Sequence, residues 1–302
     1  MLAEIRDRLP YEYTVYFGDT ARVPYGVRNL AEVREFAFEI IRYLTDLDVK
    51  LVVVACNTAS AAALEAAQAE FEVPIVGVIE PGARAAAVDT INRRVGVLAT
   101  EATVASGAYR RAVHALDAGI EVHERACPQF VPLIERGVVD GPELEGVARG
   151  YLEPLMQRRV DAVILGCTHY PLISAPINRI LGPQVRLISS AGQTALEVGR
   201  VLSRRGYLRR PRDADDLGSS TYVCSAGPAE FATLGGRFLG EKIEAVAPAA
   251  VIESSVPFCY THLRPRRGVA QPGSAPALGA GGRRFKSSRP DRSNRHAGVA
   301  QW

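Results

Sequence analysis

Residues 51–58 read Leu-Val-Val-Val-Ala-Cys-Asn-Thr, and residues 162–169 read Ala-Val-Ile-Leu-Gly-Cys-Thr-His. Each stretch is a run of mostly branched apolar residues that ends in a small residue, a cysteine and polar side chains. Such a run is typical of a strand buried on both faces in a parallel sheet. Ligands bind at the carboxyl ends of strands in open α/β sheets, so Cys56 and Cys167 are predicted to lie where chemistry occurs. We expect the two cysteines to face each other across one substrate.

Strand and helix patterns alternate along the chain. Strand patterns occur at 13–17, 51–54, 74–79, 95–99, 120–124, 162–165, 185–188, 221–224 and 243–246. Apolar residues at helical spacing lie between many of them, for example at 30–44, 143–158, 193–204 and 230–239. This alternation predicts an α/β fold with mainly parallel sheets. The repeated cysteine stretch predicts two pseudo-symmetric domains with the active site between them, the first formed by 1–79 plus 189–247 and the second by 80–188.

Composition narrows the class of protein. The 302 residues are 47% hydrophobic and 23% charged, as in soluble globular proteins. No apolar run approaches the ~20 residues that span a bilayer, and residues 1–8 are too charged for a signal peptide. We therefore expect a cytoplasmic protein without membrane contact.

Cysteine and glycine spacing bears on disulfides, metals and cofactors. Five cysteines without close spacing indicate free thiols rather than a disulfide framework or a zinc site. Residues 95–97 lack the glycine pattern of dinucleotide folds, and residues 235–242 lack phosphate-loop spacing. We expect neither a cofactor nor a metal.

The net charge of +3 comes from one end of the chain. Residues 260–302 hold nine Lys or Arg and one Asp, so residues 1–259 carry −5. The end has few large apolar residues and no periodicity, which predicts a disordered basic tail over 248–302. One interpretation of this tail is a nucleic-acid arm. The preferred interpretation is that the tail is translated from a reading frame that runs through an RNA gene. No nucleic-acid partner is expected for the acidic part of the chain, residues 1–259.

The position of both cysteines suggests their chemistry. A thiol in the first turn of a helix is stabilised as thiolate by the unpaired amides, and these amides can also hold a small carboxylate. Two bases on opposite sides of one carbon can remove a proton from one face and return one to the other, which inverts the stereocentre. A lone buried cysteine is more often a small hydrophobic residue; this is the interpretation we prefer for Cys127, Cys224 and Cys259.

Four motifs carry a family resemblance. They are Phe-Gly-Asp-Thr-Ala-Arg-Val-Pro-Tyr-Gly at 17–26, Ala-Cys-Asn-Thr-Ala-Ser at 55–60, Gly-Val-Ile-Glu-Pro-Gly at 77–82 and Gly-Cys-Thr-His-Tyr-Pro at 166–171. In this order and spacing they resemble the glutamate racemases, over roughly residues 1–240. The resemblance implies a cofactor-independent enzyme that interconverts L- and D-glutamate for peptidoglycan, commonly as a homodimer.

The resemblance also implies roles for single residues. Cys56 and Cys167 would be the acid/base pair, one as thiolate and the other as thiol. His169 would support Cys167, and Glu135 would be a further acidic assistant. The substrate would be held by Pro24, Tyr25, Gly26, Asn57, Thr58, Thr100, Thr103 and Thr168. Helix caps for the threonines and a solvent-facing Glu135 are the alternative interpretations.

The chain departs from the family pattern at its start. That pattern begins with a strand ending in Asp-Ser-Gly, whereas this chain starts inside the helix that follows, at residues 1–10. The aspartate expected to assist Cys56 and a serine expected to contact substrate are absent with it. We expect that the natural start lies upstream of Met1, and otherwise that the chain is a fragment of low stability and weak activity. Residues 188–191, Ile-Ser-Ser-Ala, also lack an aspartate that the family often has.

Three other functions stay open at this point. An aspartate or other amino-acid racemase differs from a glutamate racemase in pocket size, which the sequence does not give. An inactive remnant that only binds a partner protein would fit the missing first strand. A nucleic-acid binder would depend on residues 260–302 alone.

Overall fold

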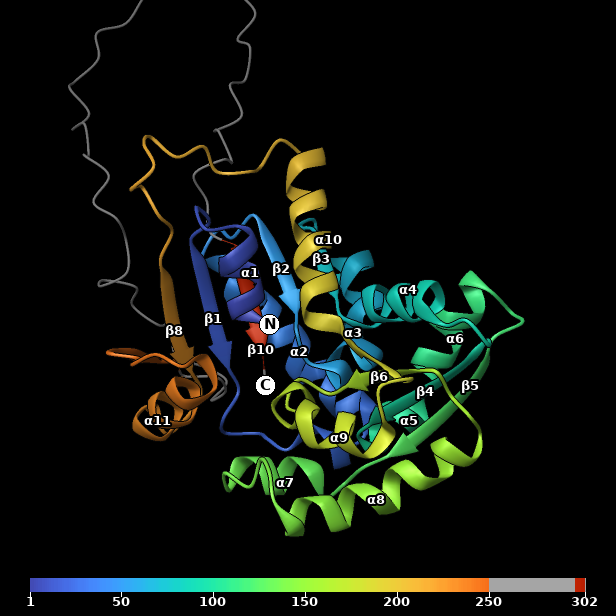
Figure 1. Cartoon of the computed structure of the whole chain (residues 1–302). Coiled ribbons are helices and arrows are strands. Elements are labelled where there is room, and N and C mark those ends of the chain that lie inside the picture. Colours follow the sequence, from blue (N-terminus) through green and yellow to red (C-terminus); the bar gives the residue numbers. More distant parts are fainter. Residues whose placement is uncertain (250–296, 302) are drawn as a thin grey trace, which may run out of the picture.

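The computed structural model describes residues 1–249 and 297–301. Within this part of the chain, the strands form a six-stranded and a four-stranded sheet, and all neighbouring strands are parallel (Figure 1). The expected α/β fold with two parallel sheets is therefore confirmed. None of the helices in the described residues is both long enough and apolar enough to cross a bilayer.

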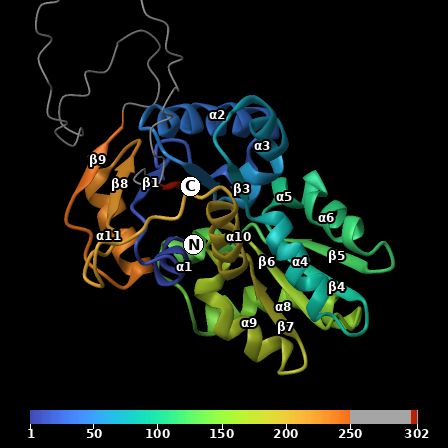
Figure 2. The same ribbon diagram turned by 90° about the horizontal axis from the view of Figure 1, so that it is seen from above.

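The first sheet has the strand order β3-β2-β10-β1-β8-β9. Its strands are β1 (Thr14–Gly18), β2 (Leu51–Val54), β3 (Ile75–Gly77), β8 (Ser220–Cys224), β9 (Val246–Pro248) and β10 (Ala297–Gln301). Helices α2 (Leu30–Asp46) and α3 (Asn57–Glu70) cover one face, and α1 (Leu2–Arg8) and α10 (Ser190–Arg204) cover the other (Figure 2).

Strand β2 is buried on both faces, as its apolar sequence predicts. Val52 and Val54 pack into the cluster of α2 and α3, whereas Leu51 and Val53 pack against α1 and α10. Side chains alternate between the two faces of a strand, and here each face is covered by helices. Every residue of β2 must therefore be apolar, and Cys56 follows where the strand ends.

The second sheet has the order β5-β4-β6-β7. Its strands are β4 (Arg94–Ala99), β5 (Glu121–Ala126), β6 (Ala162–Gly166) and β7 (Arg186–Ser189). One face packs against α4 (Ile79–Asp89) and α6 (Ala108–Leu116), and the other against α7 (Phe130–Glu135), α8 (Pro142–Gln157) and α9 (Ser174–Leu181). The remaining helical elements are α5 (Glu101–Ser106), α11 (Pro228–Leu239) and the 3₁₀ turns η1 (Tyr25–Val27) and η2 (Tyr170–Ile173).

Strand β10 corrects the expectation that the tail is without structure. Residues 297–301 lie between β1 and β2 and pair with both, from Thr14↔Ala297 to Gly18↔Gln301 and from Leu51↔Ala297 to Val54↔Ala300. Unpaired backbone groups inside a covered sheet are costly, so an interior position next to two open strand edges favours any segment that can extend. The rest of the predicted tail, 250–296 and Trp302, lies outside the described residues.

Two smaller expectations were wrong in their boundaries. The third strand ends at Gly77 instead of residue 79, because α4 begins at Ile79 and includes Pro81 and Gly82 in its first turns. Proline is accepted in a first helical turn, where its missing N–H has no intrahelical partner. The last strand of residues 1–249 spans Val246–Pro248 rather than 243–246.

Candidate active site

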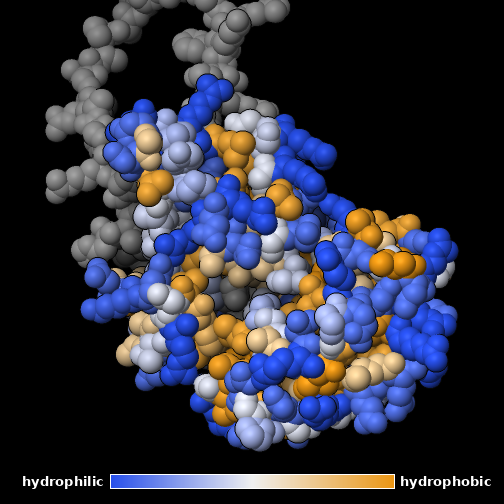
Figure 3. Space-filling model, viewed as in Figure 1, coloured by the Kyte–Doolittle hydropathy of each residue, from blue (hydrophilic) through white to orange (hydrophobic). Residues whose placement is uncertain are grey.

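A cavity of about 590 Å³ lies between the carboxyl ends of the two sheets. Segments that follow β1, β2, β4, β5 and β6 form its wall, so both sheets direct their carboxyl ends toward it, as α/β folds do at binding sites. Figure 3 shows a hollow in the same view as Figure 1, with apolar residues along part of its rim. All the site residues expected from the sequence line this cavity except Thr103.

Cys56 is the N-cap of α3 and belongs to the wall of the cavity. Burial raises the pKa of its thiol to about 12, against hydrogen bonds from the backbone of Ala59 and Thr58 and from the Thr58 hydroxyl, which lower it. The expected amides are therefore present, but burial outweighs them and the thiol form is favoured. A cation bound beside the sulfur would lower this pKa again.

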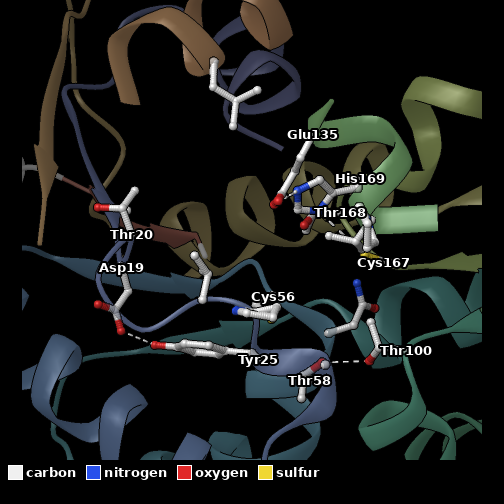
Figure 4. Close-up of a pocket in the computed structure, with 18 of the residues that line it drawn as sticks. Asp19, Thr20, Tyr25, Cys56, Thr58, Thr100, Glu135, Cys167, Thr168 and His169 are labelled. Atoms are coloured by element: carbon white, nitrogen blue, oxygen red, sulfur yellow. Dashed lines mark hydrogen bonds and ion pairs between the residues drawn. The ribbon is translucent and has the colours of Figure 1, made fainter. Parts of the chain in front are cut away.

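Cys167 lines the same cavity but has different neighbours (Figure 4). It follows β6 and precedes the 3₁₀ turn η2, so the expectation that it opens an α-helix was wrong. Its Sγ lies 3.8 Å from Nδ1 of His169, and Nε2 of His169 lies 3.4 Å from Oε1 of Glu135. Burial lowers the pKa of His169, but the bonds to Cys167 and Glu135 outweigh it and raise the pKa to about 10.

The chain Glu135–His169–Cys167 therefore holds an imidazolium at neutral pH. The structure thus gives the two sulfurs different neighbours: backbone amides at Cys56 and the His169 ring at Cys167. The two sulfurs also interact electrostatically, because negative charge on Cys167 raises the pKa of Cys56.

A cluster of hydroxyls joins the two halves of the cavity. The Thr58 hydroxyl, which follows β2, lies 3.0 Å from the hydroxyls of both Thr100 and Thr103. Thr100 caps α5 and lines the cavity, whereas Thr103 is buried behind it. The structure therefore places Thr103 in a supporting position, where it contacts Thr58 and Thr100.

Sequence reasoning gave no role to Asp19, which also lines the cavity. Its fully buried carboxylate accepts hydrogen bonds from the Tyr25 hydroxyl, from Arg22 Nε at 2.6 Å and from Ser225 Oγ at 2.7 Å. These bonds tie the loop before α2 to the end of β8. The available signal was the acid that directly follows the end of a buried strand, with an arginine three residues later.

Apolar side chains of α11 form a further part of the wall, which the sequence did not indicate. Phe231, Leu234 and Phe238 line the cavity, and the Phe238 ring meets the His169 ring edge-on at 6.0 Å between centroids. Cys127, interpreted as structural, also lines the cavity, and burial raises its pKa. Cys224 does not line it, and Cys259 lies outside the described residues.

Comparison of the sequence with known proteins identifies relatives of this chain. The family model described as Asp/Glu/Hydantoin racemase matches residues 1–197. A glutamate racemase of Geobacter metallireducens is 49% identical over 243 residues, which are 80% of this chain and 89% of the relative.

Two solved structures show the same arrangement of elements. A glutamate racemase of Bacillus anthracis superposes with a TM-score of 0.77 at 38% identity, over 82% of this chain and 91% of the other. The glutamate racemase of Francisella tularensis in complex with D-glutamate gives 0.76 at 34% identity, over 82% and 92% of the two chains. The chain described here therefore belongs to the aspartate/glutamate/hydantoin racemase family.

Proposed function

We propose that this chain interconverts L- and D-glutamate, and that in the cell it supplies D-glutamate for peptidoglycan. The observation that carries the proposal is that Cys56 and Cys167, from the ends of two strands in different sheets, line one cavity. The relatives named above, and one solved with D-glutamate bound, support glutamate as the substrate.

The proposed reaction moves two protons and needs no redox step. A thiolate on one side removes the Cα proton of the bound amino acid, and the electron pair stays on Cα next to the carboxylate. The thiol on the other side then donates its proton to the opposite face, so the product has inverted configuration. The thiolate and thiol have now exchanged roles, which sets up the reverse reaction.

The electrostatic interaction between the sulfurs is consistent with one acting as the base and the other as the acid. Charge on Cys167 raises the pKa of Cys56, so the state with one thiolate and one thiol is favoured over two thiolates. The α-ammonium group of the substrate would supply the cation that lowers the pKa of Cys56. Hydroxyl and amide donors for its two carboxylates are available on Asn57, Thr58, Thr100 and Thr168.

Solvent exchange at Cα tests the proposal directly. The chain is incubated in D₂O with L-glutamate or with D-glutamate, and deuterium and configuration are followed together. We expect the enantiomer that is formed to carry deuterium at Cα. Absence of label from both enantiomers would overturn the proposal. Faster label uptake by aspartate under the same conditions would identify aspartate as the preferred substrate.

Replacing Glu135 by glutamine should shift the pH profile. The pKa of His169 is raised to about 10, partly by Glu135, so the imidazolium is present below that pH and is lost as pH rises through it. In Glu135→Gln we expect the alkaline limb of kcat to move down by about one pH unit, because an opposite charge has been removed. Rates across pH 6–11 check this, with Glu143→Gln, an exposed partner of Arg136, as the control. An unmoved limb would mean that Glu135 does not act on His169.

Adding a methyl group at Gly26 should disturb the loop over the site. A Cβ there would lie 2.7 Å from both Cβ and Cγ2 of Thr100, so the loop and Thr100 must separate. We expect Gly26→Ala to raise KM about tenfold and to destabilise the fold by about 1–3 kcal/mol, as overpacking does. Steady-state kinetics and denaturant unfolding check this. Gly146→Ala, where a Cβ meets nothing within 4 Å, should leave KM unchanged and should not destabilise the fold, because alanine is favoured over glycine inside a helix such as α8.

Three features of the proposal rest on the family resemblance or on the sequence. They are a homodimer, a cytoplasmic location, and the division into domains 1–79 plus 189–247 and 80–188. Sedimentation and limited proteolysis would test the first and the last. The sheets support this division, because β4, β5 and β6 fall within 80–188 and β7 ends one residue beyond it, whereas the other strands of residues 1–249 fall outside.

A further inference from the structure

Tyr109 is a buried side chain of α6 that touches both cysteine motifs. Its hydroxyl donates to Oδ1 of Asn57 at 2.6 Å, and Asn57 directly follows Cys56. Its ring packs against Gly166, the residue before Cys167: a Cβ at Gly166 would lie 3.0 Å from the Tyr109 ring. Tyr109 itself does not line the cavity. It is therefore placed to act on the site through its neighbours.

Asn57 is the neighbour with an unfilled bonding group. The residue is 2% exposed and lines the cavity. Its Oδ1 is occupied by Tyr109, whereas its buried Nδ2 has no hydrogen-bond partner among the described residues. A buried donor without a partner costs about 1–3 kcal/mol, so such a group is retained where something else accepts from it.

The direction of the bond to Tyr109 decides how the Asn57 amide is turned. The Tyr109 hydroxyl donates to the Oδ1 side of the amide, and the Ser190 hydroxyl is a further hydrogen-bond neighbour of the Tyr109 oxygen. The proton of Tyr109 is directed at Asn57, and only the carbonyl oxygen of an amide accepts it. The amide cannot reverse without facing its N–H₂ group toward a donor.

We propose that Tyr109 is a positioning residue that holds the Asn57 amide with Nδ2 free to donate to a carboxylate oxygen of the substrate. This inference rests on the proposed function and adds to it how one binding group is oriented. A neutral donor fits a carboxylate without introducing a charge next to the two thiols. The order of donation is Tyr109 to Asn57, and Asn57 to the substrate.

A double-mutant cycle tests the inference. Tyr109→Phe removes only the hydroxyl, and we expect it to raise KM for glutamate about tenfold with a smaller change in kcat, as for a lost bond to a charged group. Asn57→Ala should have a similar effect. Since Tyr109 acts through Asn57, the double variant should be no worse than Asn57→Ala alone. Tyr151→Phe, whose hydroxyl accepts from the Gln129 amide, is the matched control and should leave KM unchanged.

Further measurements separate the possible outcomes. If the increases in KM caused by Tyr109→Phe and Asn57→Ala multiply in the double variant, the inference is overturned. A lower Tm of Tyr109→Phe with an unchanged KM would also overturn it. Should Tyr109→Phe not fold, Asn57→Asp serves instead: it keeps an acceptor for Tyr109 but turns an oxygen toward the carboxylate. It should therefore weaken glutamate binding more than Asn57→Ala does, and weaker impairment would overturn the inference. If the unchanged chain does not exchange the Cα hydrogen, the proposed function fails, but the inference about Tyr109 can still be tested. Calorimetry then compares the affinity of the variants for glutamate.

Discussion

Replacing either Cys56 or Cys167 by serine should reduce racemisation by about 10³-fold or more, because a serine hydroxyl is too weak an acid and base to replace a thiol at neutral pH. The two variants should differ in what they retain. The cysteine that remains can still remove a Cα proton from the one enantiomer whose hydrogen faces it. It returns a solvent proton to the same face, so slow deuterium uptake without inversion is expected.

The enantiomer that takes up label should be opposite in the two variants. Mass spectrometry of separated L- and D-glutamate after incubation in D₂O measures this. Cys224→Ser is the matched control, because Cys224 is also buried at the end of a parallel strand but does not line the cavity. Label in the same enantiomer from both variants, or equal loss of activity in Cys224→Ser, would contradict the two-base arrangement.

Loss of strand β10 should destabilise the first sheet strongly. Residues 297–301 pair with β1 on one side and with β2 on the other, so deletion of 297–302 opens two ladders at once inside a covered sheet. Each backbone group left buried without a partner costs about 1–3 kcal/mol, so a loss of more than about 3 kcal/mol in the free energy of unfolding is expected. Denaturant unfolding and amide exchange at Tyr16 and Val53, the partners of Val299, measure it.

Single proline substitutions make the same test without shortening the chain. Val299→Pro removes one N–H, and in a strand paired on both edges every such group inside the strand faces a neighbour. Val246→Pro is the control in β9, which pairs only with β8 among the described residues: the Ala249 N–H donates to the Cys224 carbonyl, so by alternation the Val246 N–H points away from β8. We expect a clearly smaller loss there. Equal midpoints for Val299→Pro and the unchanged chain would show that β10 does not hold the sheet.

The sequence by itself determined the kind of fold and the position of the thiols along it. A run of apolar residues such as 51–54 can only be covered on both faces, and the chain repeats this pattern at 162–165 before a second cysteine. Local patterns of this type depend on neighbours within a few residues, so they can be recognised from the sequence alone. The ordered motifs then indicated the family, which the comparisons confirmed.

Other features were decided only by contacts between distant parts of the chain. The position of β10 depends on two open strand edges, because the segment Ala-Gly-Val-Ala-Gln has no strand pattern of its own. The raised pKa of His169 depends on Cys167 and on the more distant Glu135, and the orientation that we propose for the Asn57 amide depends on Tyr109, 52 residues away. That Cys56 and Cys167 share one cavity depends on how two sheets pack, and spacing along a chain does not encode the distance between two packed sheets.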